Sequence, residues 1–357
     1  MPDPFSSPER PIYTSHPEPP SSRFTICGIF VGPDGLRAGW GILLFQLLRT
    51  FLLFFFALPL LFHALFPSMS GARSFSGPGQ MLPYEAMFTT AVLIATWLMA
   101  KIERRPTSVY GLGGNRRLRN FLSGLAWGVA MLSLLVFALR AAGLLVFDAR
   151  QLFGVSALRY GALWFVGFLL VGVNEEYAFR GYLQFTLARG INGIYGWLRS
   201  FSSRAAERSE TGPRASTQAA FGFWTAAFLL SFNFGLAHNS NRGESPIGLV
   251  AVVLIGLVFC LSLWRTGSLW WAIGFHAAWD WAQSFFYGVA DSGMTIQSHL
   301  FATHPVGRSI FSGGLTGPEG SLFILPILAF TAAVIILTLP SVPRSVPPAI
   351  ARAASLD

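Results

Sequence analysis

Residues 157–182 read ALRYGALWFVGFLLVGVNEEYAFRGY, an apolar run that ends in two adjacent carboxylates and an arginine. Crossing a hydrocarbon core of about 30 Å takes roughly 20 helical residues, so this run is long enough to span a membrane. Ionisable groups in such a run are costly unless they are paired or face a cavity. We therefore expect a membrane-spanning helix that carries a functional site at its end.

The composition of the whole chain excludes a soluble protein. Of its 357 residues, 53% are hydrophobic and only 11% are charged, whereas roughly 25% of the residues of soluble proteins are charged. The chain also contains 34 Phe and 11 Trp, which suit a surface that faces lipid. These values indicate an integral membrane protein.

Further apolar blocks of similar length lie on both sides of residues 157–182. They predict an all-α integral membrane protein with about eight transmembrane helices, each of roughly 20 residues, around a buried polar catalytic cavity. The eight predicted spans are 41–65, 82–101, 121–146, 157–182, 219–238, 246–264, 268–289 and 321–340.

Basic residues predict the orientation in the membrane. Arginines cluster between the second and third spans and between the fourth and fifth spans, and such loops stay in the cytoplasm. With an even number of spans, both termini are then cytoplasmic, and we expect the plasma membrane as the location. The net charge of +9 reports this topology and needs no nucleic acid to explain it.

We predict one membrane domain, residues 40–340, between two cytoplasmic tails. Residues 1–39 are rich in Pro and Ser and predict a disordered tail. Residues 341–357 form the C-terminal tail. A polar segment at 190–218 is expected to be a cytoplasmic loop.

The first candidate constellation is Glu175, Glu176 and Arg180. Glu176 and Arg180 are four residues apart, in the order that favours a salt bridge on one helix face. Glu175 is left without a cation nearby in the sequence and can serve as a general base. Coupled carboxylates titrate as a pair, so this argument does not decide which Glu is the base. The alternative is an ion pair at a helix end, with Glu175 at the membrane interface.

Two further constellations repeat the spacing of one helical turn. Phe234 and His238 close the fifth span, and His276 and Asp280 lie inside the seventh. The structural alternatives are an interfacial His238 bonded to a loop and a structural pair of His276 with Asp280. A common site for all three constellations is feasible if the helices tilt.

Together the three constellations resemble the CPBP intramembrane proteases, which include the Ras-converting CAAX endoprotease and bacterial Abi-type proteins. The pattern of that family is Glu-Glu-x-x-x-Arg, then Phe-x-x-x-His, then His-x-x-x-Asn or Asp, on separate membrane helices. The resemblance covers about residues 157–289. Its spacing departs from the family between Glu176 and His238, where we expect a cytoplasmic insertion.

The resemblance implies an intramembrane endopeptidase of the CAAX-processing type. Its substrate would be a peptide or lipidated protein, cut near a membrane-anchored or prenylated C-terminus. The implied base is Glu175, which activates water together with His238, while Glu176 and Arg180 support it. The implied oxyanion site is His276 with Asp280, and Asp280 is then either protonated or the residue that orients His276.

Other functions and a metal mechanism remain open at this point. We favour no cofactor, but Glu175, His238 and His276 have the number and type of ligands of a catalytic zinc. The sequence lacks His-Glu-x-x-His, the commonest spacing of zinc proteases. A catalytically silent membrane scaffold or immunity protein is the alternative function. A proton or small-solute transporter is less favoured, because the chain shows no two related halves. Membrane lipid is the other expected partner.

Overall fold

The computed structural model describes residues 26–32, 35–64, 77–202, 213–241 and 243–340. Its contacts divide the chain into two units, Met1–Arg37 and Ala38–Asp357. In the first unit, α1 (Ile26–Phe30) precedes a hairpin of β1 (Val31–Gly32) and β2 (Gly35–Leu36). Residues 1–25 of the predicted disordered tail and the predicted C-terminal tail, 341–357, lie outside the described residues.

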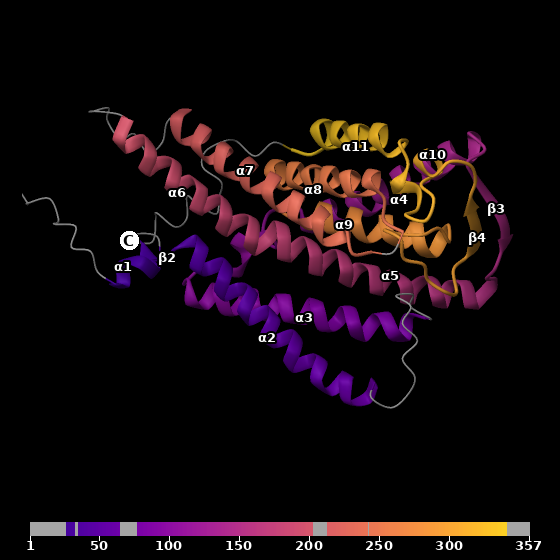
Figure 1. The fold of residues 1–357 in the computed structure, drawn as a ribbon, viewed down its shortest axis with the longest axis horizontal. Helices are drawn as coiled ribbons and strands as arrows, with labels where there is room; N and C mark the ends of the chain where they lie inside the picture. Colours follow the sequence, from indigo (N-terminus) through magenta and orange to yellow (C-terminus); the bar gives the residue numbers. More distant parts are fainter. Residues whose placement is uncertain (1–25, 33–34, 65–76, 203–212, 242, 341–357) are drawn as a thin grey trace, which may run out of the picture. The chain divides into compact units, whose positions relative to one another are not determined.

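The second unit is a helical bundle whose long helices lie side by side (Figure 1). Two short elements of this bundle, η2 and η3, are π-helical, and two, η1 and η4, are 3-10 helices. Its helices are α2 (Ala38–Ala64), α3 (Pro78–Ile102), η1 (Thr107–Tyr110), α4 (Arg117–Ala141), α5 (Gly154–Glu176), η2 (Tyr177–Leu183), α6 (Gln184–Ser202), α7 (Pro213–His238), α8 (Pro246–Thr266), α9 (Trp270–Asp280), η3 (Trp281–Phe286), α10 (Ser309–Ser312), η4 (Pro318–Gly320) and α11 (Ile324–Thr338).

The chain is an all-α integral membrane protein, but the predicted count of eight spans is not confirmed. Six helical stretches of the described residues are long and apolar enough to cross a membrane. They are Ala38–Phe56, Pro78–Ile102, Arg117–Ala141, Gly154–Leu198, Thr217–His238 and Pro246–Thr266. The last two predicted spans contain shorter helices: α9, with 11 residues, is followed directly by η3, with 6, and α11 has 15. The fourth predicted span continues without a break into α6, so part of the predicted loop 190–218 is helical.

The segments that connect the helices differ between the two ends of the bundle: one end carries the strands β3 (Leu145–Arg150) and β4 (Phe301–Pro305) (Figure 1). At that end a small antiparallel sheet, which the sequence analysis did not predict, joins β3 to β4. At the other end the Arg-rich α3–α4 connection packs on the start of α9, where the Leu269 N–H donates to the Gly111 carbonyl at 2.9 Å. The cytoplasmic location of that end stays a prediction.

Helix α9 is held between α4 and α5 by close backbone contacts. A Cβ atom on Gly124 of α4 would lie 2.2 Å from the Trp271 carbonyl oxygen, and one on Gly274 of α9 would lie 2.3 Å from the Phe121 carbonyl oxygen. On the α5 side, a Cβ atom on Gly172 would lie 3.2 Å from the Ile273 carbonyl oxygen. Such small residues let membrane helices approach closely, so the backbone of α9 has little freedom to shift.

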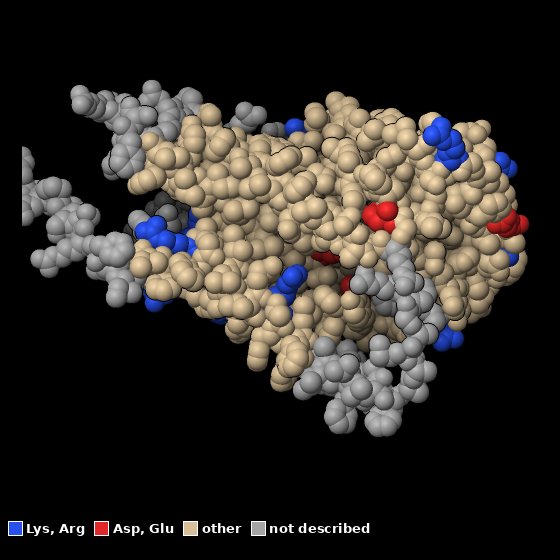
Figure 2. Space-filling model, viewed as in Figure 1, with Lys and Arg blue, Asp and Glu red and all other residues tan. Residues whose placement is uncertain are grey.

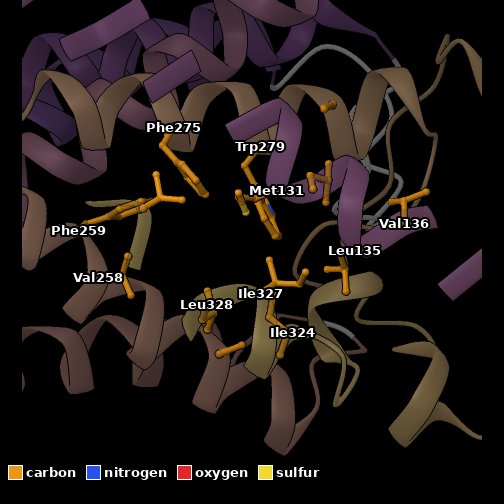
Figure 3. Packing of buried hydrophobic residues seen from close by; sticks show 14 of the residues in the cluster. Met131, Leu135, Val136, Val258, Phe259, Phe275, Trp279, Ile324, Ile327 and Leu328 are labelled. Atoms are coloured by element: carbon orange, nitrogen blue, oxygen red, sulfur yellow. The ribbon is translucent and has the colours of Figure 1, made fainter. Parts of the chain in front are cut away.

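The apolar core lies on another side of α9 (Figure 3). Phe275 and Trp279 point from α9 toward Ile324 and Ile327, which belong to α11. The ring of Phe275 also contacts that of Phe259 on α8, with centroids 5.6 Å apart. The core therefore fixes the rotation of the helix that carries His276 and Asp280.

The α4–α9 crossing should not tolerate even one methyl group. We expect Gly124→Ala to lower the thermal unfolding temperature of the detergent-purified protein, because overpacking costs roughly 1–3 kcal/mol. The matched control is Gly79→Ala on α3, where a Cβ atom would meet nothing within 4 Å. That substitution should leave the temperature unchanged or raise it slightly. Equal effects of the two substitutions would contradict the close crossing.

Candidate active site

The paired carboxylates lie at the junction of α5 and the π-helical turn η2. Glu176 is the last residue of α5, and Arg180 belongs to η2. Single π-helical turns are rare and occur often at functional sites. The side chains of Glu176 and Arg180 are 0% and 2% exposed, and the predicted salt bridge joins Glu176 Oε1 to Arg180 Nη1 at 2.9 Å. This burial distinguishes the pair from an ordinary ion pair at a helix end.

His276 of α9 is surrounded by three carboxylates. Its Nδ1 atom lies 3.0 Å from Glu176 Oε1. Its Nε2 atom lies 3.4 Å from Asp280 Oδ2 and 3.7 Å from Glu175 Oε2. The first and third constellations, which are 100 residues apart in the chain, therefore meet directly.

The second constellation contributes His238 from the end of α7. Its Nδ1 atom lies 2.8 Å from the Phe234 carbonyl oxygen, to which it donates as Nδ1–H, and its ring stands edge-on to the Phe234 ring at 4.6 Å. This bond uses one ring nitrogen and leaves Nε2 to take part in chemistry. The Phe234 ring in turn lies 4.3 Å from the Arg180 guanidinium carbon. The second constellation thus reaches the first through Phe234.

One cavity of about 160 Å³ connects the three constellations. Glu175, His238, His276 and Asp280 line it, whereas Glu176 and Arg180 lie behind its wall. Apolar side chains from α5, α8, α9 and α11 form much of the remaining surface. In the space-filling view, acidic atoms are visible inside a hollow of the molecule (Figure 2). The predicted buried cavity is therefore present. A few polar side chains converge in it, and most of its remaining lining is apolar.

Three further carboxylates that the sequence analysis missed line the same cavity: Glu85, Asp291 and Glu319. Glu85 lies in α3, within a predicted span, so the rule that ionisable residues in apolar spans are functional candidates could have found it. Asp291 and Glu319 belong to the long connection between η3 and α11. Their positions depend on the fold of that connection, and no spacing in the sequence indicates them.

Glu319 and Asp291 are held by hydrogen bonds from serines. The Ser292 N–H and hydroxyl donate to Glu319 Oε1 at 2.5 and 3.0 Å, and the Ser284 hydroxyl donates to Asp291 Oδ2 at 3.2 Å. Burial and the neighbouring Asp291 carboxylate raise the pKa of Glu319 to about 8. Burial, together with the Asp280 carboxylate, also raises the pKa of Asp291. The cavity wall at this connection therefore binds protons more readily than exposed carboxylates do.

The described residues do not fit the zinc alternative. Within the part of the chain that the structure describes, no three His, Cys, Asp or Glu side chains are placed to hold one metal ion. His276 instead directs Nδ1 to Glu176 and Nε2 to Asp280 and Glu175. Activity in the presence of a chelator tests this arrangement.

Comparison with known proteins supports the resemblance. Residues 157–282 match the family model described as type II CAAX prenyl endopeptidase, Rce1-like. The match confirms the predicted family over this segment, which contains all six predicted site residues. This segment is therefore similar to the CAAX-type intramembrane proteases. Neither the curated proteins nor the solved structures contain a match to the chain.

The buried pair predicts a large effect on stability. Glu176→Gln should lower the free energy of unfolding by roughly 3–5 kcal/mol, because Arg180 would keep its buried charge without a counter-charge. A matched control is Asp148→Asn, since Asp148 pairs with His304 at 2.8 Å while their side chains are 44% and 53% exposed. We expect the control to change stability by less than about 1 kcal/mol. Thermal or denaturant unfolding in detergent measures both, and similar losses would contradict the account.

Glu319 predicts a fall in stability with rising pH. A carboxyl whose pKa is raised in the folded protein favours the protonated state. Its contribution to stability is therefore complete below the ordinary pKa of 4.5 and is lost as the pH rises toward about 8. Glu319→Gln should reduce the fall in unfolding temperature between roughly pH 5 and pH 8. An identical fall in the variant and the wild type would contradict the assignment.

Proposed function

We propose that the chain hydrolyses a peptide bond near a membrane-anchored or prenylated C-terminus, and that the cavity described above is its active site. One observation carries the proposal: Glu175, His238, His276 and Asp280, from three different helices, line one cavity within the segment that matches the family. The apolar part of the cavity suits a substrate that enters from the membrane.

Glu175 is the carboxylate placed to act on water. Its side chain is 28% exposed and lines the cavity, whereas Glu176 is fully buried and engaged by both Arg180 and His276. A general base must reach the proton that it abstracts. Glu175 therefore takes the proton from the attacking water, beside His238, and returns it to the leaving amine.

His276 is placed to stabilise the negative oxygen that forms when water attacks the carbonyl. A donor that is held in position before the reaction lowers the cost of that charge. Glu176 holds His276 Nδ1, and Asp280 lies 3.4 Å from Nε2. Glu176 and Arg180 then support the site from behind.

Peptide cleavage by the detergent-purified protein tests the proposal. We expect the wild type to cut peptides of a panel offered with and without a C-terminal farnesyl-cysteine, and to stay active with a chelator. Glu175→Gln and His238→Ala should each lower the rate by roughly 100-fold or more, because general base catalysis contributes about 10²–10⁴-fold.

The matched control is His304→Ala, since His304 is exposed on β4 and does not line the cavity. It should keep the wild-type rate. Loss of activity with the chelator would contradict the metal-free mechanism. A folded wild-type protein that cleaves no peptide in the panel would contradict the proposed activity and favour the scaffold.

A further inference from the structure

Arg180 lies behind the cavity wall. On the side away from Glu176 it is next to Ser231 and Gly256, to which the proposed mechanism gives no role. Its Nη1 atom pairs with Glu176 Oε1, the same oxygen that lies 3.0 Å from His276 Nδ1. The position of the guanidinium therefore determines where the Glu176 carboxylate stands, and that carboxylate orients the His276 ring. Whatever holds Arg180 also holds the proposed oxyanion donor.

Helix α8 passes very close to the guanidinium at Gly256. A Cβ atom on Gly256 would lie 2.6 Å from Arg180 Nη2 and 2.8 Å from Ser231 Oγ on α7. Carbon atoms do not approach other heavy atoms so closely, so a methyl group at this position would force them to move. Arg180 Nη2 is the end of a flexible side chain, and it can move while the helices stay in place. The first consequence of a side chain at position 256 is thus a displaced guanidinium.

Packing, more than hydrogen bonding, holds this end of Arg180. Neither Arg180 Nη2 nor Ser231 Oγ completes a hydrogen bond within the described residues, although both are buried. The Phe234 ring lies 4.3 Å from the guanidinium carbon, and the Cys260 thiol, one turn after Gly256, lies close enough to interact with Arg180 and Ser231. The packing of Phe234, Ser231 and Gly256 around the guanidinium therefore determines its position.

We propose that Gly256 and Ser231 are positioning residues of the active site. With Phe234 they form a socket that keeps the Arg180 guanidinium against Glu176 and, through Glu176, orients His276. The inference rests on the proposed peptide hydrolysis. Phe234 lines the cavity, whereas Gly256 and Ser231 do not, so substitutions of Gly256 and Ser231 should act on the chemical step and not on substrate binding.

Steady-state kinetics of Gly256→Ala tests this distinction. A displacement of about 1 Å in a catalytic group can cost roughly 100-fold in rate, so we expect kcat to fall about 10- to 100-fold while KM changes by less than about 2-fold. The matched control is Gly193→Ala on α6, where a Cβ atom would meet nothing within 4 Å, and it should keep both constants. An unchanged kcat, or a loss confined to KM, would overturn the proposal.

A double-mutant cycle with Arg180→Lys shows whether the effect passes through Arg180. Lys carries no atom that corresponds to Nη2, so the added methyl group of Gly256→Ala then meets Ser231 alone and displaces no guanidinium. We expect Gly256→Ala to lower kcat much less in the Arg180→Lys background than in the wild type. The same factor in both backgrounds would indicate a general packing defect and overturn the socket.

Histidine-selective ¹⁵N NMR in detergent separates failure of the socket from failure of the proposed function. Gly256→Ala should shift the His276 signals in the direction that Glu176→Gln shifts them, and should leave the His304 signals unmoved. Unmoved His276 signals would overturn the socket whatever the activity. Shifted signals in a protein that cleaves no peptide would uphold the socket and overturn the proposed function alone. If Gly256→Ala does not fold, Ser231→Ala, which adds no atom, replaces it and should give a smaller shift of the same sign.

Discussion

The burial of the Glu176 carboxylate is the constraint on which the candidate site depends. A charge deep in a membrane bundle is costly unless it is paired, and Glu176 meets this requirement with one oxygen that faces both Arg180 Nη1 and His276 Nδ1. The two contacts fix η2 and α9 relative to the end of α5. They also leave Glu175 as the carboxylate that faces the cavity. Glu176 thus supports the structure of the site, and the adjacent Glu175 is left to act as the proposed base.

Close helix packing makes that geometry possible. Inside a bilayer, helices associate through tight packing and polar contacts, and small residues let backbones approach. Gly124 and Gly274 allow this between α4 and α9, and Gly172 allows it between α5 and α9. The α9 backbone is thereby held at the distance at which His276 reaches Glu176. The π-helical turns η2 and η3 then begin directly after Glu176 and Asp280.

The sequence was informative where the signal is local. One-turn spacings predicted the Glu176–Arg180 and His276–Asp280 contacts, and apolar length predicted an all-α membrane protein. It was less informative where the outcome depends on tertiary packing. Helix α9 is apolar and buried inside the bundle, and even together with η3 it is not among the helices long enough to span a membrane. The cavity position of Glu319 depends on a long connection, which periodicity does not describe.

The central claim is that Glu175 performs chemistry in this cavity and does not merely bind substrate. The most direct measurement compares wild type and Glu175→Gln with one fluorescent peptide, by anisotropy for affinity and by single-turnover cleavage for the chemical step. The account predicts an affinity within about 3-fold of wild type and a cleavage rate constant at least about 100-fold lower. Cleavage at the wild-type rate, or a loss explained entirely by weaker binding, would contradict it.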